Sequence, residues 1–417
     1  MIAGSLRIDG ARLASRIRKL GRIGALDGGG VCRLALTPSE KLGRDHLVAE
    51  MRGLGLEVAI DAIGNIFGIR KGRRPSPVVM LGSHIDTVAT GGLYDGALGV
   101  LAGLEVAAAL NDAGIETELP VVVAAFTNEE GARFAPDMLG SLVFAGGMPL
   151  REALDIVSID GRHLGDELEA IGYAGNDSGP TEIAAYFELH IEQGPVLEDE
   201  GIEIGVVEGV QGISWTELTI AGRSAHAGTT PIRLRRDAGL AAARIAAGVG
   251  AFVREMGGDQ AGTVGVLSLS PNLVNVVAES ALMTVDLRNP DGTALKAAEA
   301  KLSALVAEVA GQEGVTVKRR SLARFEPVDF NPELVGLVEE AARALEFSTR
   351  RMFSGAGHDA QMIARLAPSA MIFVPSVGGI SHNVTEYTDP ADLANGANVL
   401  LQVVLKQALP TNEGVHV

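Results

Sequence analysis

Two continuous apolar runs constrain the fold of this chain more than any other feature. Residues 77–81 (PVVML) and 120–126 (PVVVAAF) are each long enough for a buried strand, and residues 96–113 between them have the Ala and Leu content of a helix. Strands that are apolar along their whole length are typical of parallel or mixed sheets with both faces covered. The sequence therefore predicts an α/β fold around a mixed sheet. Ligands of such sheets bind beyond the carboxyl ends of the strands.

The segment after residue 211 has a different pattern. Residues 214–221 (SWTELTIA) alternate apolar and polar side chains, as a half-exposed antiparallel strand does. A helix at 235–255, strands at 262–269 and 281–288, a helix at 293–311 and a strand at 314–320 would complete the β-α-β-β-α-β order of a ferredoxin-like unit. The 417 residues are also too many for one ordinary core. We predict a larger domain formed by residues 1–211 and 329–417, with residues 212–328 inserted as a small α+β domain.

The remaining elements of the larger domain follow from periodicity and turn residues. Residues 151–180 are polar and are expected to be rich in loops. Residues 57–69 have the pattern of a hairpin with Gly64 and Asn65 at its turn. Helical periodicity predicts helices at 8–22, 39–54, 331–346 and 357–366, and apolar runs predict strands at 184–189 and 369–374.

Histidines and acids follow the predicted strands. His84 and Asp86 follow the first apolar run, Asp95 precedes the helix, and Glu129 and Glu130 follow the second run. Imidazole and carboxylate groups are ligands for divalent metals, and a spare carboxylate can act as a general base. Positions i and i+2 of a strand point the same way, so Asp86 could hold the second imidazole nitrogen of His84. Together these residues indicate metal-assisted hydrolysis.

Each of these residues also has a structural interpretation. The first His and Asp could cap a loop, Asp95 could be a helix N-cap, and two adjacent glutamates usually mark an exposed loop. The placement of the histidines favours a site. The chain has eight histidines, and five of them occur in glycine-rich turns or at predicted strand ends: His84, His190, His226, His358 and His382.

Six motifs carry a resemblance to a known family. They are GSHIDT, GGLYDG, TNEEGARF, ELHIEQGP, GRSAHAGTTP and ISHNVTEY. With them the chain resembles, over nearly its whole length, the di-metal amidohydrolases of the aminoacylase/carboxypeptidase-like metallopeptidase superfamily. It looks most like the N-carbamoyl-L-amino acid hydrolases, which lie close to β-ureidopropionase and allantoate amidohydrolase.

The resemblance implies a metal centre. It implies two divalent ions per subunit, which could be Zn, Mn, Co or Ni because mixed nitrogen and oxygen ligands suit all four. Glu129 would be the general base, Asp86 would orient His84, and Asp95 would bridge the two ions. The implied metal ligands are His84, Asp95, Glu130, His190 and His382.

The resemblance also implies a substrate site and an activity. Arg288 and Asn275 would grip a substrate carboxylate, and His226 would polarise the scissile carbonyl, either in its own site or in that of a partner subunit. The implied substrate positions are Gln193, His226, Asn275, Arg288 and Gly357. The implied reaction is hydrolysis of the ureido C–N bond of N-carbamoyl-L-amino acids to the L-amino acid, CO2 and ammonia. The inserted domain would dimerise and act as a lid.

Composition restricts partners and location. The net charge of −17 argues against a nucleic acid partner. Cys32 is the only cysteine, which excludes a disulfide within the chain and fits a reducing compartment. No apolar run approaches the ~18 residues that span a bilayer, and the first residues lack a signal-peptide core, so we expect a cytoplasmic protein. The family resemblance implies that it is a homodimer.

Several alternatives remain open. An allantoate amidohydrolase or a β-ureidopropionase would use the same metals and the same carboxylate clamp on a related ureido acid. A dipeptidase or aminoacylase is less favoured, because ELHIEQGP resembles the ureido-cleaving branch. A catalytically inactive binding protein on this fold would lack Glu129 or a ligand, and the sequence has all of them.

Overall fold

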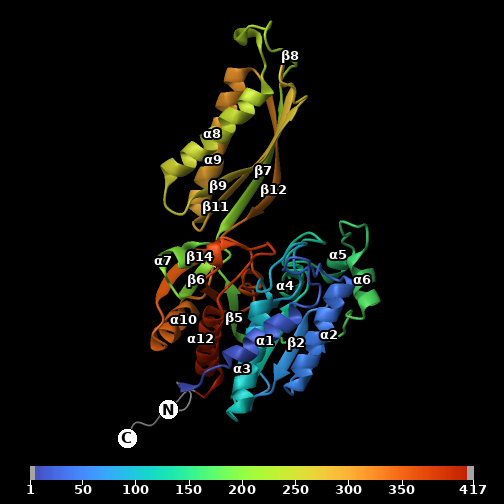
Figure 1. Ribbon diagram of the computed structural model, residues 1–417, viewed down its shortest axis with the longest axis vertical. Coiled ribbons are helices and arrows are strands. Elements are labelled where there is room, and N and C mark those ends of the chain that lie inside the picture. Colours follow the sequence, from blue (N-terminus) through green and yellow to red (C-terminus); the bar gives the residue numbers. More distant parts are fainter. Residues whose placement is uncertain (1–4, 411–417) are drawn as a thin grey trace. The chain divides into compact units, whose positions relative to one another are not determined.

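The computed structural model describes residues 5–410. The chain divides into two compact units, shown in Figure 1. Unit 1 contains the described residues up to Gly209 and those from Asp329 onward, and unit 2 is Val210–Val328. The sequence pattern predicts residues 212–328 for the inserted domain.

A mixed sheet is the centre of unit 1. Its strand order is β1-β2-β4-β3-β5-β15-β6-β13, and β14 also pairs with β6. The strand β3 runs parallel to β4 and to β5, and β5 runs parallel to β15, whereas β2 and β6 are antiparallel to their neighbours β4 and β15. The prediction of a mixed sheet is confirmed. The strands are β1 (Glu57–Ile60), β2 (Ile66–Arg70), β3 (Val78–His84), β4 (Val121–Phe126), β5 (Ile183–Ile191), β6 (Ile204–Val210), β13 (Val328–Asp329), β14 (Thr349–Ser354) and β15 (Ser369–Val374).

Helices cover this sheet. The strands β3, β4 and β15 are buried at every position, as strands with both faces covered must be. The helices α1, α3, α10 and α12 pack together, and α3 and α12 contact β3 and β5. The helices are α1 (Gly10–Leu20), α2 (Pro38–Gly53), α3 (Ala97–Asp112), α4 (Leu139–Phe144), α5 (Leu150–Leu154), α6 (Leu164–Ile171), α7 (Val196–Glu200), α10 (Pro332–Ala344), α11 (Asp359–Ile363) and α12 (Pro390–Ala408).

The register of the parallel strands brings their carboxyl ends to one edge. His84, the last residue of β3, pairs with Phe126, the last residue of β4. His190 of β5 pairs with Phe373, next to the end of β15. Residues that follow these strands therefore start from neighbouring points, which is the geometry that concentrates ligand-binding side chains.

Unit 2 has the β-α-β-β-α-β order of a ferredoxin-like unit. Its antiparallel sheet has the order β12-β7-β11-β9, and α8 and α9 pack against it. Burial alternates along β7, and Leu218, Ile220, Ile245 and Met283 belong to the core between helices and sheet. The elements are β7 (Gly212–Ala221), α8 (Ala238–Met256), β9 (Ala261–Ser270), β11 (Ser280–Asn289), α9 (Gly292–Glu313) and β12 (Thr316–Phe325).

Several elements were not predicted. The segment 151–180, expected to be rich in loops, contains α6 and most of α5. These helices are too short to give a long periodic signal, although Leu164, Leu168 and Ile171 form a buried stripe on α6. The strands β6 and β14 and the C-terminal helix α12 were also not anticipated. The short strands β8 (Ala225–His226) and β10 (Val276–Val277) form a two-stranded ribbon in unit 2.

Candidate metal centre

The sheet edge of unit 1 gathers the five predicted metal ligands. His84 ends β3, Asp95 precedes α3, Glu130 follows β4 and His190 lies in β5, while His382 comes from the loop before α12. All five side chains line one pocket of about 100 Å³. The pocket also contains Glu129, Gln193 and Gly357. Residues from five separate stretches of unit 1 therefore converge at the point that the strand ends define.

Asp95 lies between two groups of possible ligands. Its Oδ1 atom is 3.2 Å from Nε2 of His190 and 3.6 Å from Nε2 of His84. Its Oδ2 atom is 3.3 Å from Nε2 of His382, and this nitrogen is 3.2 Å from Oε2 of Glu130. Each group could hold one metal ion: His84, Asp95 and His190, or Asp95, Glu130 and His382. A carboxylate shared by both groups is in the position of a bridging ligand.

Backbone carbonyls orient two of the imidazole rings. Nδ1 of His84 lies 3.0 Å from the carbonyl oxygen of Asp86, and Nδ1 of His190 lies 2.8 Å from that of Ile191. Because a carbonyl only accepts, each Nδ1 carries a proton, and in the neutral ring the lone pair is then on Nε2, which faces Oδ1 of Asp95. Nε2 of His190 also accepts from the backbone N–H of Gly96 at 3.1 Å. Neutral imidazole with an unprotonated Nε2 is the form that binds a metal.

The backbone carbonyl of Asp86, and not its carboxylate, contacts the His84 ring. The Oδ1 atom of Asp86 is 3.8 Å from Nδ1 of His84, which is too far for a hydrogen bond. Its two carboxylate oxygens instead accept from the backbone N–H groups of Glu129 and Glu130, at 3.2 and 3.3 Å. The turn after His84 directs the carbonyl of Asp86 to the ring, which leaves its carboxylate to hold the two glutamates.

Backbone strain and a close approach shape the site. Gly96 has φ +61°, and a Cβ atom there would lie 2.3 Å from Nε2 of His84. Only glycine leaves room for the ring at this position. Asn128, Gln193 and His382 have positive φ values between 55° and 59° although they are not glycine. Such residues cluster at functional sites, where the surrounding structure holds them.

Burial and close charges shift the pKa values of the site. Burial raises the pKa of Glu129 well above its usual range, and the carboxylates of Asp359, Glu130 and Asp95 raise it further against the opposing effect of His84. Burial also raises the pKa of Glu130, with Asp95 adding to the effect. For Asp95, burial would raise the pKa, but hydrogen bonds with His190, His382 and His84 hold it well below its ordinary value.

Glu386 is a site residue that the sequence analysis missed. Its Oε1 accepts from the backbone N–H groups of Tyr94 and Asp95, at 3.0 and 3.2 Å. Ser381 donates to Asp95 Oδ2 at 2.9 Å and lies 3.1 Å from Oε2 of Glu386. Burial, followed by the charge of Asp95, raises the pKa of Glu386 to about 7. Its place in ISHNVTEY, four residues after His382, was the available signal.

The two predicted substrate residues of unit 1, Gln193 and Gly357, line the pocket of the candidate metal ligands. Gln193 donates through Nε2 to Asp95 Oδ2 at 2.9 Å, and its buried Oε1 has no hydrogen-bond partner among the described residues. Gly357 lies beside Met138, whose Cε atom would be 2.9 Å from a Cβ at position 357. An amide oxygen left without a donor next to the ligand cluster is free to accept from a bound molecule.

The three predicted residues of unit 2 do not form one group. His226 pairs with Val276 in the ribbon, so it lies next to Asn275, whose carbonyl accepts from Ala227. Arg288 is near the other end of β11, about 26 Å from Ser280 at ~3.3 Å per residue. The side chain of Arg288 forms a bidentate ion pair with Asp286. Most of the length of β11 therefore separates Arg288 from Asn275 within one chain, and their predicted role as a carboxylate clamp stays a prediction.

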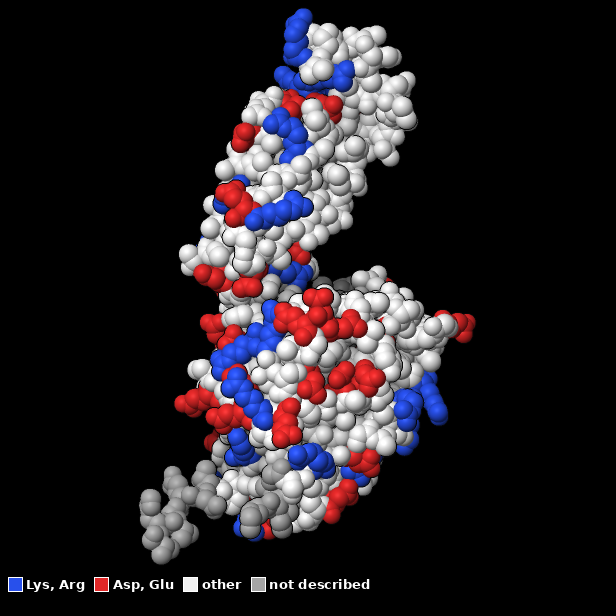
Figure 2. All heavy atoms as spheres, turned by 60° about the vertical axis from the view of Figure 1, so that its left-hand side comes forward, with Lys and Arg blue, Asp and Glu red and all other residues white. Residues whose placement is uncertain are grey.

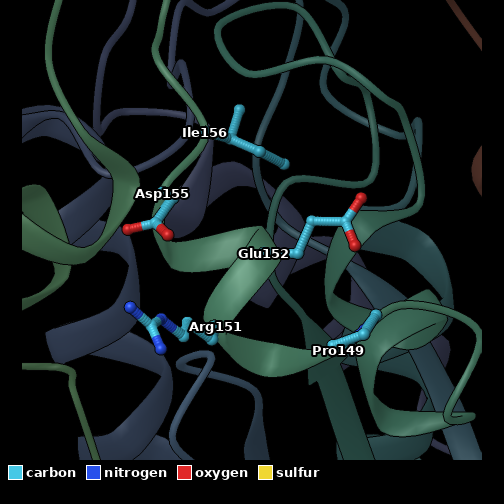
Figure 3. A pocket seen from close by; sticks show the side chains of 5 residues that line it. All are labelled: Pro149, Arg151, Glu152, Asp155 and Ile156. Carbon is cyan, nitrogen blue, oxygen red and sulfur yellow. The ribbon is translucent and has the colours of Figure 1, made fainter.

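A larger hollow lies elsewhere on unit 1. Figure 3 shows this hollow of about 440 Å³, which is lined by Pro149, Arg151, Glu152, Asp155 and Ile156. It shares no residue with the metal-ligand pocket, contains no histidine, and its charged side chains are exposed. We assign it no function.

The donor set of the smaller pocket fits a pair of divalent ions. Three carboxylates and three imidazoles lie within hydrogen-bond range of one another, and all but His382 are largely buried. Buried carboxylates that raise one another's pKa are stabilised by added positive charge. Mixed nitrogen and oxygen donors suit zinc and other first-row divalent metals.

The chain is similar to known proteins over nearly its whole length. A family profile described as peptidase family M20/M25/M40 matches residues 80–406. The chain is 43% identical to an N-carbamoyl-L-amino-acid amidohydrolase of Rhizobium meliloti, over 96% of this chain and 97% of the relative. It is 34% identical to a ureidoglycolate hydrolase of Arabidopsis thaliana, over 98% of this chain and 88% of the relative.

A solved structure gives the same result for the fold. An amidase of the hydantoinase/carbamoylase family from Burkholderia multivorans is 45% identical, with a TM-score of 0.94 over 97% of this chain and 99% of the other. The chain belongs to peptidase family M20/M25/M40. Within residues 5–410, no helix is both long and apolar enough to cross a bilayer.

Proposed function

We propose that this protein hydrolyses the ureido C–N bond of N-carbamoyl-L-amino acids, giving the L-amino acid, CO2 and ammonia. The observation that carries the proposal is the position of Asp95 between two ligand groups, with Glu129 beside them. The name of the relative from Rhizobium meliloti, an N-carbamoyl-L-amino-acid amidohydrolase, supports this choice of substrate.

Glu129 is the proposed general base. Two divalent ions held by His84, Asp95, Glu130, His190 and His382 would supply Lewis acidity toward water and a carbonyl. The Oε2 atom of Glu129 lies 3.3 Å from Nε2 of His84, so this carboxylate faces the ligand group without belonging to it. Glu129 takes a proton from the attacking water and returns it to the leaving nitrogen. Its raised pKa suits a group that must both accept and release a proton.

His226 is the proposed donor to the developing oxyanion. Its Nδ1 accepts from the backbone N–H groups of Gly228 and Thr229, at 3.0 and 3.2 Å. This places the proton of the neutral ring on Nε2, which can then donate to a substrate carbonyl oxygen. The unpartnered Oε1 of Gln193 supports a role in accepting from a substrate N–H. Arg288 would bind the substrate carboxylate, exchanging its bond with Asp286 for one with the ligand.

We further propose that two copies complete each other's site. The distance between Arg288 and Asn275 supports this proposal, because one small substrate could use both only if they came from different chains. The edge strand β9 supports a dimer through the inserted unit: Val266, Leu267 and Leu269 on it are 42%, 49% and 40% exposed. An exposed apolar edge strand is a template for pairing with a second chain. Arg223, Arg233 and Arg236, near β8 in unit 2, are exposed. Figure 2 shows Lys and Arg side chains gathered at one end of this unit.

The proposal also includes a lid, a cellular compartment and a second candidate substrate. The inserted unit would act as a lid that excludes water when substrate is bound. The single cysteine, Cys32, supports a reducing compartment such as the cytoplasm. A related ureido acid is the second candidate substrate, because a curated relative that matches nearly the whole chain is named ureidoglycolate hydrolase. Allantoate and N-carbamoyl-β-alanine belong to the same group.

Ammonia release from N-carbamoyl-L-methionine tests the function. The protein loaded with Mn2+ should release ammonia, and a chelator should stop the reaction. Rates with N-carbamoyl-β-alanine, allantoate and ureidoglycolate, measured under the same conditions, rank the substrates. No metal-dependent ammonia from any of the four would reject the proposal, and the fastest substrate decides between the two candidates.

A further inference from the structure

A buried acidic layer lies next to the metal-ligand residues and has no part in the mechanism above. Glu188, two residues before His190 on β5, and Asp359, the first residue of α11, are both fully buried. Glu188, His190 and His358 also form a third group of the kind that can bind metal. However, the Glu188 oxygens already accept from Ser83 and from the backbone N–H of Ala360, so we treat Glu188 as structural.

Asp359 is connected to the turn that carries Glu129. The hydroxyl of Ser141, in α4, lies 2.5 Å from Oδ1 of Asp359 and 3.1 Å from the carbonyl oxygen of Met138. The backbone N–H of Met138 donates to the carbonyl oxygen of Glu129 at 2.6 Å. The neighbouring backbone groups form a second bond of the same kind: the N–H of Leu139 donates to the carbonyl oxygen of Asn128. The chain of contacts thus runs from Asp359 through Ser141 and Met138 to the main chain of the proposed base.

This turn is strained and needs support. Met138 and Asn128 have φ values of +52° and +56°, a region that side chains other than glycine rarely adopt. A backbone held there persists only when its surroundings over-determine it. The main chain of Glu129 is fixed on both sides: Asp86 accepts from its N–H, and Met138 donates to its carbonyl.

A count of hydrogens shows which form of Asp359 fits. Ser141 has one hydroxyl hydrogen but two oxygen neighbours, Met138 O and Asp359 Oδ1. If Asp359 were ionised, these two acceptor atoms would share the one hydrogen, and the buried Oδ2, which has no hydrogen-bond partner among the described residues, would be a bare anionic oxygen. If Asp359 is protonated, it donates to Ser141, and Ser141 donates to Met138. Each contact then has its own hydrogen.

We propose that Asp359 is a positioning residue for Glu129. In this role Asp359 is a neutral acid that donates to Ser141 and so fixes the left-handed turn at Met138. The role of Glu129 as base belongs to the proposed function, and this inference rests on it. The surroundings agree: burial, followed by the nearby Glu188, raises the pKa of Asp359 well above its ordinary value. The charged groups acting on Asp359 also include His84 and Asp86.

Three variants test the proposal by steady-state kinetics on the metal-loaded enzyme. Asp359→Ala should lower kcat about 100-fold, the cost of a small misplacement of a catalytic group, with KM and metal content unchanged. Asp359→Asn is neutral and keeps a donor, so kcat should stay within about fivefold of the wild type. Ser141→Ala should also lower kcat, and adding it to Asp359→Ala should cause little further loss. Ser369→Ala is the matched control, because this buried serine donates only to Ala367 O.

An infrared measurement makes the result independent of the substrate. The difference spectrum between the metal-loaded wild type and Asp359→Asn should contain the C=O band of a protonated carboxylic acid. Its absence would overturn the proposal, as would wild-type kcat in Asp359→Ala or an Asp359→Asn as slow as Asp359→Ala. If the wild type cleaved no ureido acid, the proposed function would fail, and the spectrum would still decide the state of Asp359.

Discussion

The two units hold their candidate functional residues in opposite ways. In unit 1, His84, Asp95 and His190 are 2%, 4% and 1% exposed, and hydrogen bonds fix two of the rings and the carboxylate of Asp95. In unit 2, His226 and Asn275 are exposed, on a two-residue ribbon. The first arrangement is a site already formed within one chain. In the second, the candidate residues lie on an exposed surface. We therefore expect the candidate metal ligands and the candidate substrate contacts to respond differently to mutation and to assembly.

Metal removal should have the largest effect and should act on unit 1 alone. Chelation is expected to abolish turnover. If the ions are present at about 1,000 times their Kd, their loss removes ~4 kcal/mol of stability. Calorimetry with hydrogen exchange should then show a melting temperature lower by roughly 10 °C for unit 1 and unchanged protection of the unit 2 core. Equal destabilisation of both units would contradict the comparison.

Glu129→Gln should separate chemistry from metal binding. The amide keeps the size of the side chain but cannot take a proton, so kcat should fall by about 10³-fold. Metal content, measured by mass spectrometry of the purified protein, should equal that of the wild type. A variant that keeps its activity would remove Glu129 as the base, and one that loses metal would make it a ligand.

His226→Ala should reduce kcat by about 100-fold, the usual effect of losing one oxyanion donor.

Mixing the His226→Ala and Glu129→Gln variants tests whether each active site contains residues from both chains of a dimer. In a hybrid dimer one site would combine an intact Glu129 with an intact His226 from the other chain, so random exchange should restore about a quarter of wild-type activity. No recovery after verified subunit exchange would mean that His226 serves its own chain.

Leu267→Lys should have the smallest effect on the site and should act through assembly. A lysine on the β9 edge discourages strand pairing, and the dimer should dissociate at about 10–100-fold higher concentration in sedimentation velocity. Leu322→Lys is the control, because Leu322 is 43% exposed and lies on β12 at the opposite edge of the same sheet. If Leu322→Lys dissociated the dimer and Leu267→Lys did not, the dimer interface would lie on β12 and not on β9.

The sequence predicted those features that depend on short stretches of chain. The buried apolar runs before His84 and Glu129 predicted the mixed sheet, and the ends of these strands predicted where the acids and histidines would lie. The five proposed ligands gather there, although their metal-binding roles stay predictions. The short helices α5 and α6 were missed because five to eight residues give little periodicity.

Features that depend on contacts between distant residues were not predictable. Glu386 accepts from Asp95 across 291 positions of the chain, and Ser141 bonds Asp359 across 218. The carbonyl of Asp86, rather than its carboxylate, orients His84, because the path of the turn decides which oxygen faces the ring. The separation of Arg288 from Asn275 along β11 was not foreseen either, because motif similarity says nothing of the distance between two motifs.

The glycine at position 96 has a consequence for the interpretation of homologous sequences. The His84 ring occupies the volume that any larger residue would need, 2.3 Å from where a methyl carbon would be. A homologue with alanine or serine at that position must therefore place the counterpart of His84 differently. If His84 is a metal ligand, the residue at position 96 can serve as a sequence marker that separates homologues with an intact metal site from those without one.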